Sequence, residues 1–223
     1  MEAKYPIIQF SEDKQEVCCC YVLPVSEGSD LAFFSPVTGG GIWYLTNLNG
    51  DKISDEYITT SEGFVDVFGI DLSAILASGD CFRIVAGNYF STPFQYIGCD
   101  TDNTHVFKYW DNDDISQQSV RLSCIIDKPQ SKTDKSEYVD SNGLNISLSK
   151  TRRKQFDLTT DFYPENVHDA IKEILLYPNL LVDDEAMFES GDYDIEWGEE
   201  DENDNARATT KLSEQDINRY SIC

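Results

Sequence analysis

The sequence predicts a mainly β protein, with an antiparallel β-sandwich or barrel core followed by a smaller α+β portion that contains one amphipathic helix. Short runs of β-branched and aromatic residues recur along the first 126 residues, with turn residues between them. The chain contains 12 Tyr, 12 Phe and 3 Trp, which suits sheets that pack through flat rings. Only one segment, residues 164–177, has a clear helical period.

Residues 1–126 are expected to form the β-sandwich or barrel domain. Asn49-Gly50 favours a hairpin turn because both residues tolerate positive φ, and Asp71–Gly79 predicts a short helical turn with Asp71 as its N-cap. The expected strands are Tyr5–Phe10, Val17–Val25, Leu31–Phe34, Ile42–Leu45, Phe64–Phe68, Cys81–Ala86, Phe94–Cys99, His105–Tyr109 and Val120–Ile126.

Residues 127–223 are expected to form the α+β portion, and the polar stretch 127–137 is interpreted as a loop or boundary. The helix 164–177 presents Val167, Ala170, Ile171, Ile174 and Leu175 on one face, which should cover a sheet. A turn is expected at Ser141-Asn142-Gly143, and residues 198–205 form an acidic loop. The expected strands are Glu137–Val139, Leu144–Ser149, Lys154–Thr159, Leu180–Val182, Met187–Phe188, Tyr193–Trp197 and Arg207–Leu212.

The net charge of −24 disfavours autonomous binding to nucleic acid or to anionic membranes. Residues 157–223 hold 19 acidic and 4 basic side chains, so most of the imbalance lies in the C-terminal third. The N-terminus lacks the pattern of a signal peptide, and no apolar run approaches the ~20 residues that a membrane span needs. We expect synthesis in the cytoplasm and no membrane partner.

The seven cysteines indicate neither a zinc site nor a disulfide framework. Their number is odd, no Cys-x-x-Cys pair occurs, and the chain has two histidines. Adjacent strand residues point to opposite faces, so Cys18, Cys19 and Cys20 cannot converge on one metal. Burial as small hydrophobic side chains in a reducing cytoplasm is the interpretation.

No catalytic motif is found, so we expect no enzyme, no catalytic residue and no cofactor. The nucleophile elbow, zinc, phosphate-loop and dinucleotide fingerprints are all missing from the sequence. His105 and His168 are interpreted as solvated surface residues. The Asp-rich segments 100–103 and 111–114 could hold calcium, but turn formation explains the same residues and the EF-hand pattern is lacking.

Charge and aromatic patterning indicates either an ordinary solvated edge or an interface. The strand around Tyr193 and Trp197 alternates apolar with acidic residues, as an edge strand would, and a short basic cluster lies ahead of the acidic third. We hypothesise that the acidic edge and loop pair with this basic cluster of a neighbouring subunit. The candidate interface residues are Lys150, Arg152, Arg153, Lys154, Tyr193, Trp197, Glu199, Glu200, Asp201 and Glu202.

Over residues ~65–223 the chain resembles structural proteins of phages that infect Bacteroidetes, including crAss-like phages. The resemblance rests on the order of the segments Gly79–Arg83, Phe90–Ile97, Phe107–Trp110, Thr159–Phe162 ahead of the helix, Ser190–Trp197, Lys211–Ser213 and Ser221–Cys223. It implies a virion component of the tail, neck or baseplate, present in several copies, with no catalytic residues to transfer.

The sequence therefore predicts a non-enzymatic virion protein that assembles as a homo-oligomeric ring, hub or baseplate layer with other tail or neck proteins. We hypothesise that its negative charge lets it line a DNA channel without holding the DNA. The alternative is a carbohydrate-binding or adhesin-type β-sandwich, in which Tyr and Trp stack on sugars and the Asp-rich turns hold calcium.

Overall fold

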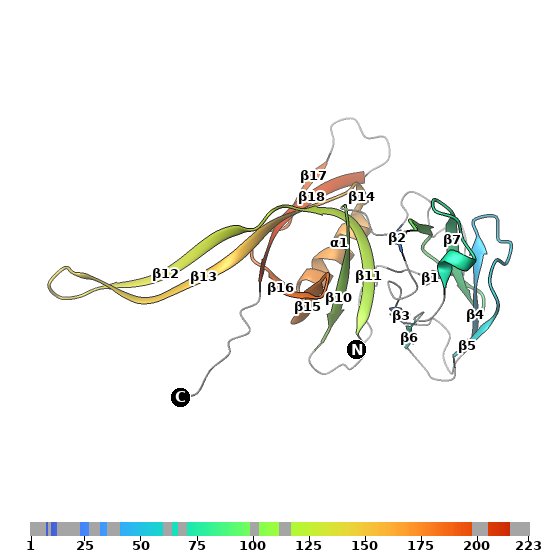
Figure 1. Ribbon diagram of the computed structural model, residues 1–223, viewed down its shortest axis with the longest axis horizontal. Coiled ribbons are helices and arrows are strands. Elements are labelled where there is room, and N and C mark those ends of the chain that lie inside the picture. Colours follow the sequence, from blue (N-terminus) through green and yellow to red (C-terminus); the bar gives the residue numbers. More distant parts are fainter. Residues whose placement is uncertain are drawn as a thin grey trace.

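The computed structural model describes residues 8, 10–12, 23–26, 32–34, 41–59, 64–66, 71–98, 103–111, 117–197 and 205–214. Its strands form two sheets that share one hydrophobic core (Figure 1). All pairs are antiparallel except β2 with β9. The predicted class, a mainly β protein with a small helix, is confirmed.

The first sheet comes from the N-terminal half of the chain. β7 and β4 are its longest strands, and β7 is paired with β4, β8 and β9. Its strands are β1 (Phe10–Ser11), β2 (Leu23–Val25), β4 (Gly41–Asn47), β5 (Tyr57–Thr59), β7 (Cys81–Ala86), β8 (Tyr89–Ser91) and β9 (Phe94–Tyr96).

Two turns of this half agree with the sequence. Gly50 has φ of +98°, and the Gly50 amide donates to the Asn47 carbonyl. The short helix is a 3₁₀ turn, η2 (Leu72–Ala74), whose N-cap Asp71 accepts from the Ser73 amide. Both turns follow from local chemistry, which explains why the sequence alone predicted them.

The second sheet is larger and includes strands from both sides of residue 126. β10 pairs with β15, and β11 pairs with β13, so the two halves of the chain share one hydrogen-bonded sheet. Its strands are β3 (Ala32–Phe34), β6 (Phe64–Asp66), β10 (Thr104–Trp110), β11 (Gln118–Ile126), β12 (Gln130–Val139), β13 (Asn145–Thr160), β14 (Tyr163–Pro164), β15 (Asn179–Val182), β16 (Glu185–Glu189), β17 (Asp194–Trp197) and β18 (Asn205–Glu214).

Six of these strands close into a barrel. The path β13–β18–β16–β15–β10–β11 returns to β13 through the pairs Cys124↔Thr160, Ile125↔Thr159 and Ile126↔Leu158. Alternate residues of β13 and β18 point inward and are buried, among them Phe156, Leu158 and Leu212. The apolar face of helix α1 (Glu165–Leu175) joins the same core.

The interpretation of residues 127–137 as a loop is wrong. β12 and β13 form one long hairpin, here called the arm, which projects from the barrel (Figure 1). The arm comprises residues 130–154, and its tip is the predicted turn, where Gly143 has φ of +79° and the Asp140 carboxylate accepts from the Asn142 and Leu144 amides. The described side chains of β12, at residues 130–133, 138 and 139, are all exposed, and the sequence of the strand lacks the apolar alternation by which a strand is recognised.

The placement of His168 on a solvated surface is also wrong. Its side chain is fully buried, because Tyr193 and β18 cover the flank of α1 next to the apolar face. The Ala206 carbonyl can only accept, so His168 Nε2–H donates to it at 2.8 Å, and Nδ1 accepts from the Tyr193 hydroxyl at 2.8 Å. Burial lowers the pKa of His168, and the ring is therefore neutral at pH 7.

This arrangement predicts a pH-dependent stability. The unfolded chain binds a proton at His168 below about pH 6.5, whereas the folded chain resists it, so the free energy of unfolding should fall as the pH drops below that value. His168→Gln should lower stability at pH 7 by about 2 kcal/mol and flatten the dependence between pH 7 and 5. Urea unfolding at several pH values measures both, with Asn166→Gln on the exposed side of α1 as control. An unchanged slope in His168→Gln would contradict the assignment.

Candidate functional site

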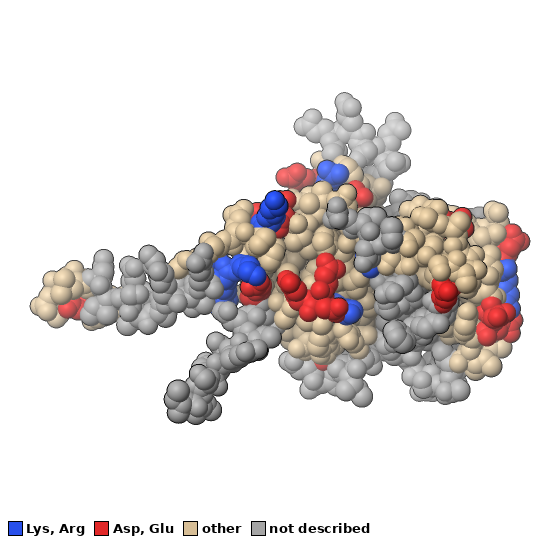
Figure 2. All heavy atoms as spheres, in the orientation of Figure 1, with Lys and Arg blue, Asp and Glu red and all other residues tan. Residues whose placement is uncertain are grey.

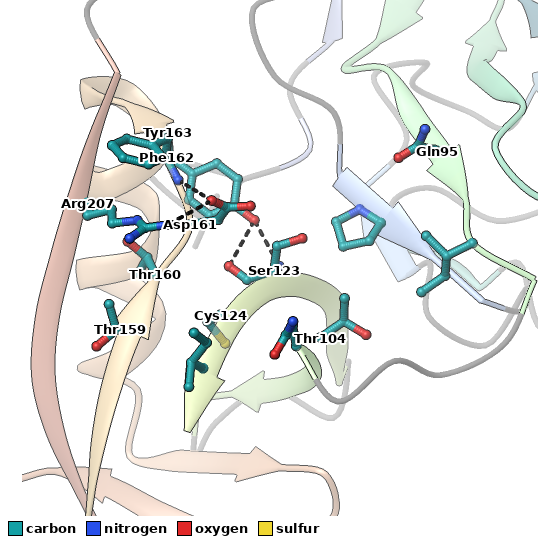
Figure 3. A pocket seen from close by; sticks show the side chains of 14 residues that line it. Gln95, Thr104, Ser123, Cys124, Thr159, Thr160, Asp161, Phe162, Tyr163 and Arg207 are labelled. Atoms are coloured by element: carbon teal, nitrogen blue, oxygen red, sulfur yellow. Dashed lines mark hydrogen bonds and ion pairs between the residues drawn. The ribbon is translucent and has the colours of Figure 1, made fainter. Parts of the chain in front are cut away.

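A cleft of about 480 Å³ lies at the junction of the two sheets. It is bounded by β2 and the end of β9 on one side, and by β11, the end of β13 and Arg207 on the other (Figure 3). Its polar lining includes Thr104, Ser123, Cys124, Thr160, Asp161 and Tyr163.

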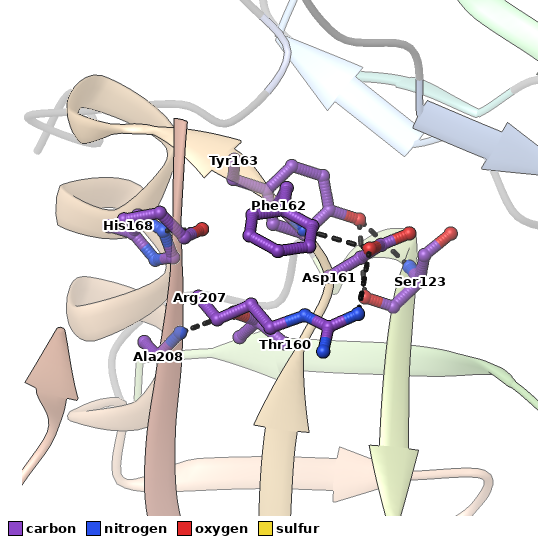
Figure 4. Close-up of polar contacts among 9 residues, drawn as sticks. Ser123, Thr160, Asp161, Phe162, Tyr163, His168, Arg207 and Ala208 are labelled. Atoms are coloured by element: carbon purple, nitrogen blue, oxygen red, sulfur yellow. Dashed lines mark hydrogen bonds and ion pairs between the residues drawn. The ribbon is translucent and has the colours of Figure 1, made fainter. Parts of the chain in front are cut away.

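These polar groups hydrogen-bond mainly to one another and to the backbone (Figure 4). The Tyr163 hydroxyl accepts from the Ser123 amide at 2.9 Å, and the Asp161 amide donates to the Ser123 carbonyl at 3.0 Å. Thr160 Oγ1 accepts from the Ala208 amide at 2.8 Å. The contacts join β11, β13 and β18 where the barrel closes, and their geometry fits a structural role.

The titratable groups of the cleft are poorly suited to catalysis. Burial raises the pKa of the Cys124 thiol and of the Tyr163 phenol, so both are protonated at neutral pH and the thiol is a weak nucleophile. Arg207 Nη2 lies 4.0 Å from Asp161 Oδ1, and its guanidinium stacks 4.3 Å from the centre of the Phe162 ring. The carboxylate therefore faces a cation and the arginine covers an aromatic ring.

His105, predicted to be a solvated surface residue, belongs to a second polar cluster on β10. The β15–β16 hairpin turns through Asp183 and Asp184, whose φ values are +49° and +67°. Asp183 accepts from His105 Nδ1 at 2.5 Å and from the Val106 amide at 2.9 Å, and Asp184 pairs with Lys108. We call this cluster of His105, Asp183, Lys108 and Asp184 the Asp183 clasp. The sequence interpretation missed it because His105 and Asp183 are 78 residues apart. The available signal was the pair of adjacent acidic residues between two β-prone runs.

The predicted interface residues lie in two regions of the second sheet. Lys150, Arg152, Arg153 and Lys154 belong to the arm strand β13, where Arg153 stacks 5.4 Å from the Phe188 ring and Lys154 pairs with Glu214. Tyr193 is half-buried against His168, whereas Trp197 on β17 is 49% exposed. Glu199, Glu200, Asp201 and Glu202 lie outside the described residues, as does most of the acidic loop 198–205.

The arm carries more positive charge than the predicted cluster. Residues 128–154 contain seven basic and three acidic residues, while the other 196 residues contain 10 basic and 38 acidic ones. Figure 2 shows basic side chains at the root of the arm and acidic side chains gathered over the central body. Net charge summed along the sequence in short windows would have added Lys128, Lys132 and Lys135 to the basic cluster. These three residues lie in the segment 127–137 that the sequence analysis interprets as a loop or boundary.

Metal binding finds little support in the residues that can be placed. Of the Asp-rich segments 100–103 and 111–114, only residues 103 and 111 are described. Within the described ranges, no group of three or more His, Cys, Asp or Glu side chains could hold a metal ion. Cys81 and buried Cys124 are free thiols there, whereas Cys18, Cys19, Cys20, Cys99 and Cys223 lie outside these ranges. No described helix has the length and hydropathy of a membrane span.

Comparison with protein-family models and with curated proteins finds no match to this chain. The resemblance to phage structural proteins therefore stays a prediction.

The Asp183 clasp gives a second pH-dependent prediction. Burial by itself would raise the pKa of Asp183, but the hydrogen bonds from His105 and Val106 outweigh it and hold the pKa below its ordinary value. The stabilisation is therefore present above about pH 4 and is lost as the pH falls through the folded-state pKa.

Asp183→Asn keeps a residue that tolerates positive φ, and should lower the thermal midpoint at pH 7 by roughly 2–4 °C. The difference from the native chain should shrink as the pH falls below about 4, because the unfolded chain then binds a proton at Asp183 before the folded chain does. Asp184→Asn is the control, because Asp184 is mostly exposed and its ion pair contributes little. Thermal unfolding followed by circular dichroism measures both, and equal effects of the two variants would contradict the clasp.

Proposed function

We propose that this protein is a non-enzymatic structural component of a tailed-phage virion, assembled in several copies in the tail or neck through contacts made by the arm. One observation carries the proposal: a long two-stranded hairpin extends from a closed barrel, and along residues 130–139 and 145–154 its strands pair with no other described strand. An isolated two-stranded hairpin is at best marginally stable in water. A partner surface would provide the packing contacts that an isolated hairpin lacks.

The tip of the arm supports the same function. Tyr138, Val139 and Leu144 are 54%, 57% and 64% exposed, and they flank the turn at the far end of the hairpin. Exposed apolar side chains grouped on a projecting element are typical of a protein–protein contact. The ring, hub or baseplate role rests on the resemblance of residues ~65–223 to phage structural proteins.

The cleft supports a role without catalysis. The Asp161 carboxylate faces Arg207, and the Thr160 hydroxyl accepts a hydrogen bond from the backbone. The Cys124 thiol and the Tyr163 phenol have raised pKa values. Catalytic sites instead concentrate groups whose pKa values are tuned toward the working pH. The carbohydrate-binding alternative ranks second, because the exposed aromatic rings of the described residues, Tyr138, Phe162 and Trp197, lie on three separate segments and Arg207 covers Phe162.

Removal of the arm tests the proposal. In the test variant, Asn-Gly replaces residues 132–153, so that the pair Ser131↔Lys154 is joined by a two-residue turn. The native chain should form a discrete oligomer in light scattering and mass photometry, and the variant should be a folded monomer. The double variant Tyr138→Ser and Leu144→Ser should weaken assembly by roughly tenfold, because two apolar anchors are lost.

The control for the tip is Ile58→Ser, which removes a residue 73% exposed on β5 and should leave assembly unchanged. A native chain that stays monomeric up to about 100 µM would overturn the assembly role. Antibody labelling of virions of the phage that encodes the chain should mark the tail or neck, and labelling confined to the capsid would contradict that location.

A further inference from the structure

The arm has a free edge whose charges alternate with the period of a strand. One edge of β13 pairs with β12 and then with β11, whereas its other edge pairs with β18 only at residues 155–159. Along residues 145–154 no described strand occupies that second edge. Ten residues of strand span about 33 Å, and their unpaired backbone groups can accept another strand.

The register concentrates positive charge on one face of the arm. The pairs Ser131↔Lys154, Thr133↔Arg152 and Lys135↔Lys150 follow one another at two-residue intervals, so their residues share a face. Lys135 and Lys150 are directly opposite each other, as are Lys132 and Arg153 on the other face. Directly opposed like charges destabilise a strand pair. An acidic partner beside the arm would relieve this repulsion.

A matching edge lies on the body. β17 pairs with β18 through Asp194↔Thr209 to Trp197↔Ala206, and no described strand pairs with its other side. Asp192, Asp194 and Glu196 are exposed and alternate along this segment. Asp192 and Asp194 also line a groove of about 540 Å³ at the root of the arm. The acidic row therefore has the same two-residue spacing, about 6.7 Å, as the basic row of the arm.

We propose that the free edge of β13 in one copy adds as a strand to the β17 edge of a second copy, so that Lys150, Arg152 and Lys154 face Asp192, Asp194 and Glu196. The proposal rests on the proposed function and names the contact that builds the assembly. Strand addition satisfies both backbone edges, and the opposed charges fix the register.

The central ion pair does not depend on strand direction. With the two rows aligned, Arg152 lies opposite Asp194 whether the strands run parallel or antiparallel. Lys154 already pairs with Glu214 in its own chain, which holds the root of the arm. The contact is heterologous, because the arm of each copy binds the edge of the next, and such contacts generate a ring where the rotation between copies closes.

A charge exchange tests this contact. The arm variant Lys150→Glu/Arg152→Glu and the edge variant Asp192→Lys/Asp194→Lys should each weaken self-association by roughly tenfold or more, because attraction becomes repulsion at two positions. An equimolar mixture of the two variants should regain assembly within about threefold of the native chain, since each arm then meets an edge of opposite charge. One chain that carries all four substitutions should regain it as well.

Controls separate this contact from the general role. Asp169→Lys/Glu173→Lys makes the same charge change on α1, where Asp169 is exposed and Glu173 is half-buried, and should leave assembly unchanged. If Asp192→Lys/Asp194→Lys assembles normally while removal of the arm abolishes assembly, strand addition at β17 is wrong and the assembly role stands. If only reversal of Glu199–Glu202 disrupts assembly, the arm binds the acidic loop instead. A native chain that never assembles overturns both proposals.

Discussion

The hydrogen-bonding of β13 is the constraint on which the rest of the structure depends. At residues 155–160 this strand has neighbours on both edges, because β18 lies on one side and β11 or the end of β12 on the other, and this pairing closes the barrel. At residues 145–154 only β12 is paired with it. One continuous strand therefore belongs to a closed barrel at one end and to an open ribbon at the other. The ribbon keeps an edge that the barrel has eliminated.

Buried polar groups hold the body in one arrangement and leave little capacity for chemistry. His168 joins α1 to β18 and to Tyr193, while Thr160 and Tyr163 join the ends of β13 and β14 to β18 and β11. Each of these side chains forms a hydrogen bond with a neighbouring element, as is usual for buried polar groups. Thr160 and Tyr163, which line the cleft at the junction of the sheets, are therefore already hydrogen-bonded within the body.

Charge in this protein is segregated by element. The segment 128–154, which is the arm together with the two residues before it, has net charge +4, in a chain whose net charge is −24. The acidic body repels phosphate at long range, whereas the arm is attracted to acidic surfaces at short range. In the proposed assembly, copies of the chain bind head to tail, because each copy offers one basic ribbon and one acidic edge.

The sequence by itself determined the β class, the α1 helix, the turns at Asn49-Gly50, Asp71 and Gly143, and most strands of the body, because these depend on local periodicity and turn chemistry. It also placed Trp197 on an alternating edge strand. Only the tertiary structure decided the barrel closure, the burial of His168 and the identity of the arm. Most residues of β12 are polar and its described side chains are exposed, so its structure comes from backbone pairing with β13, which leaves no trace in hydropathy. Pairing between distant segments, such as Asp183 with His105, is set by three-dimensional packing and not by the spacing of residues along the chain.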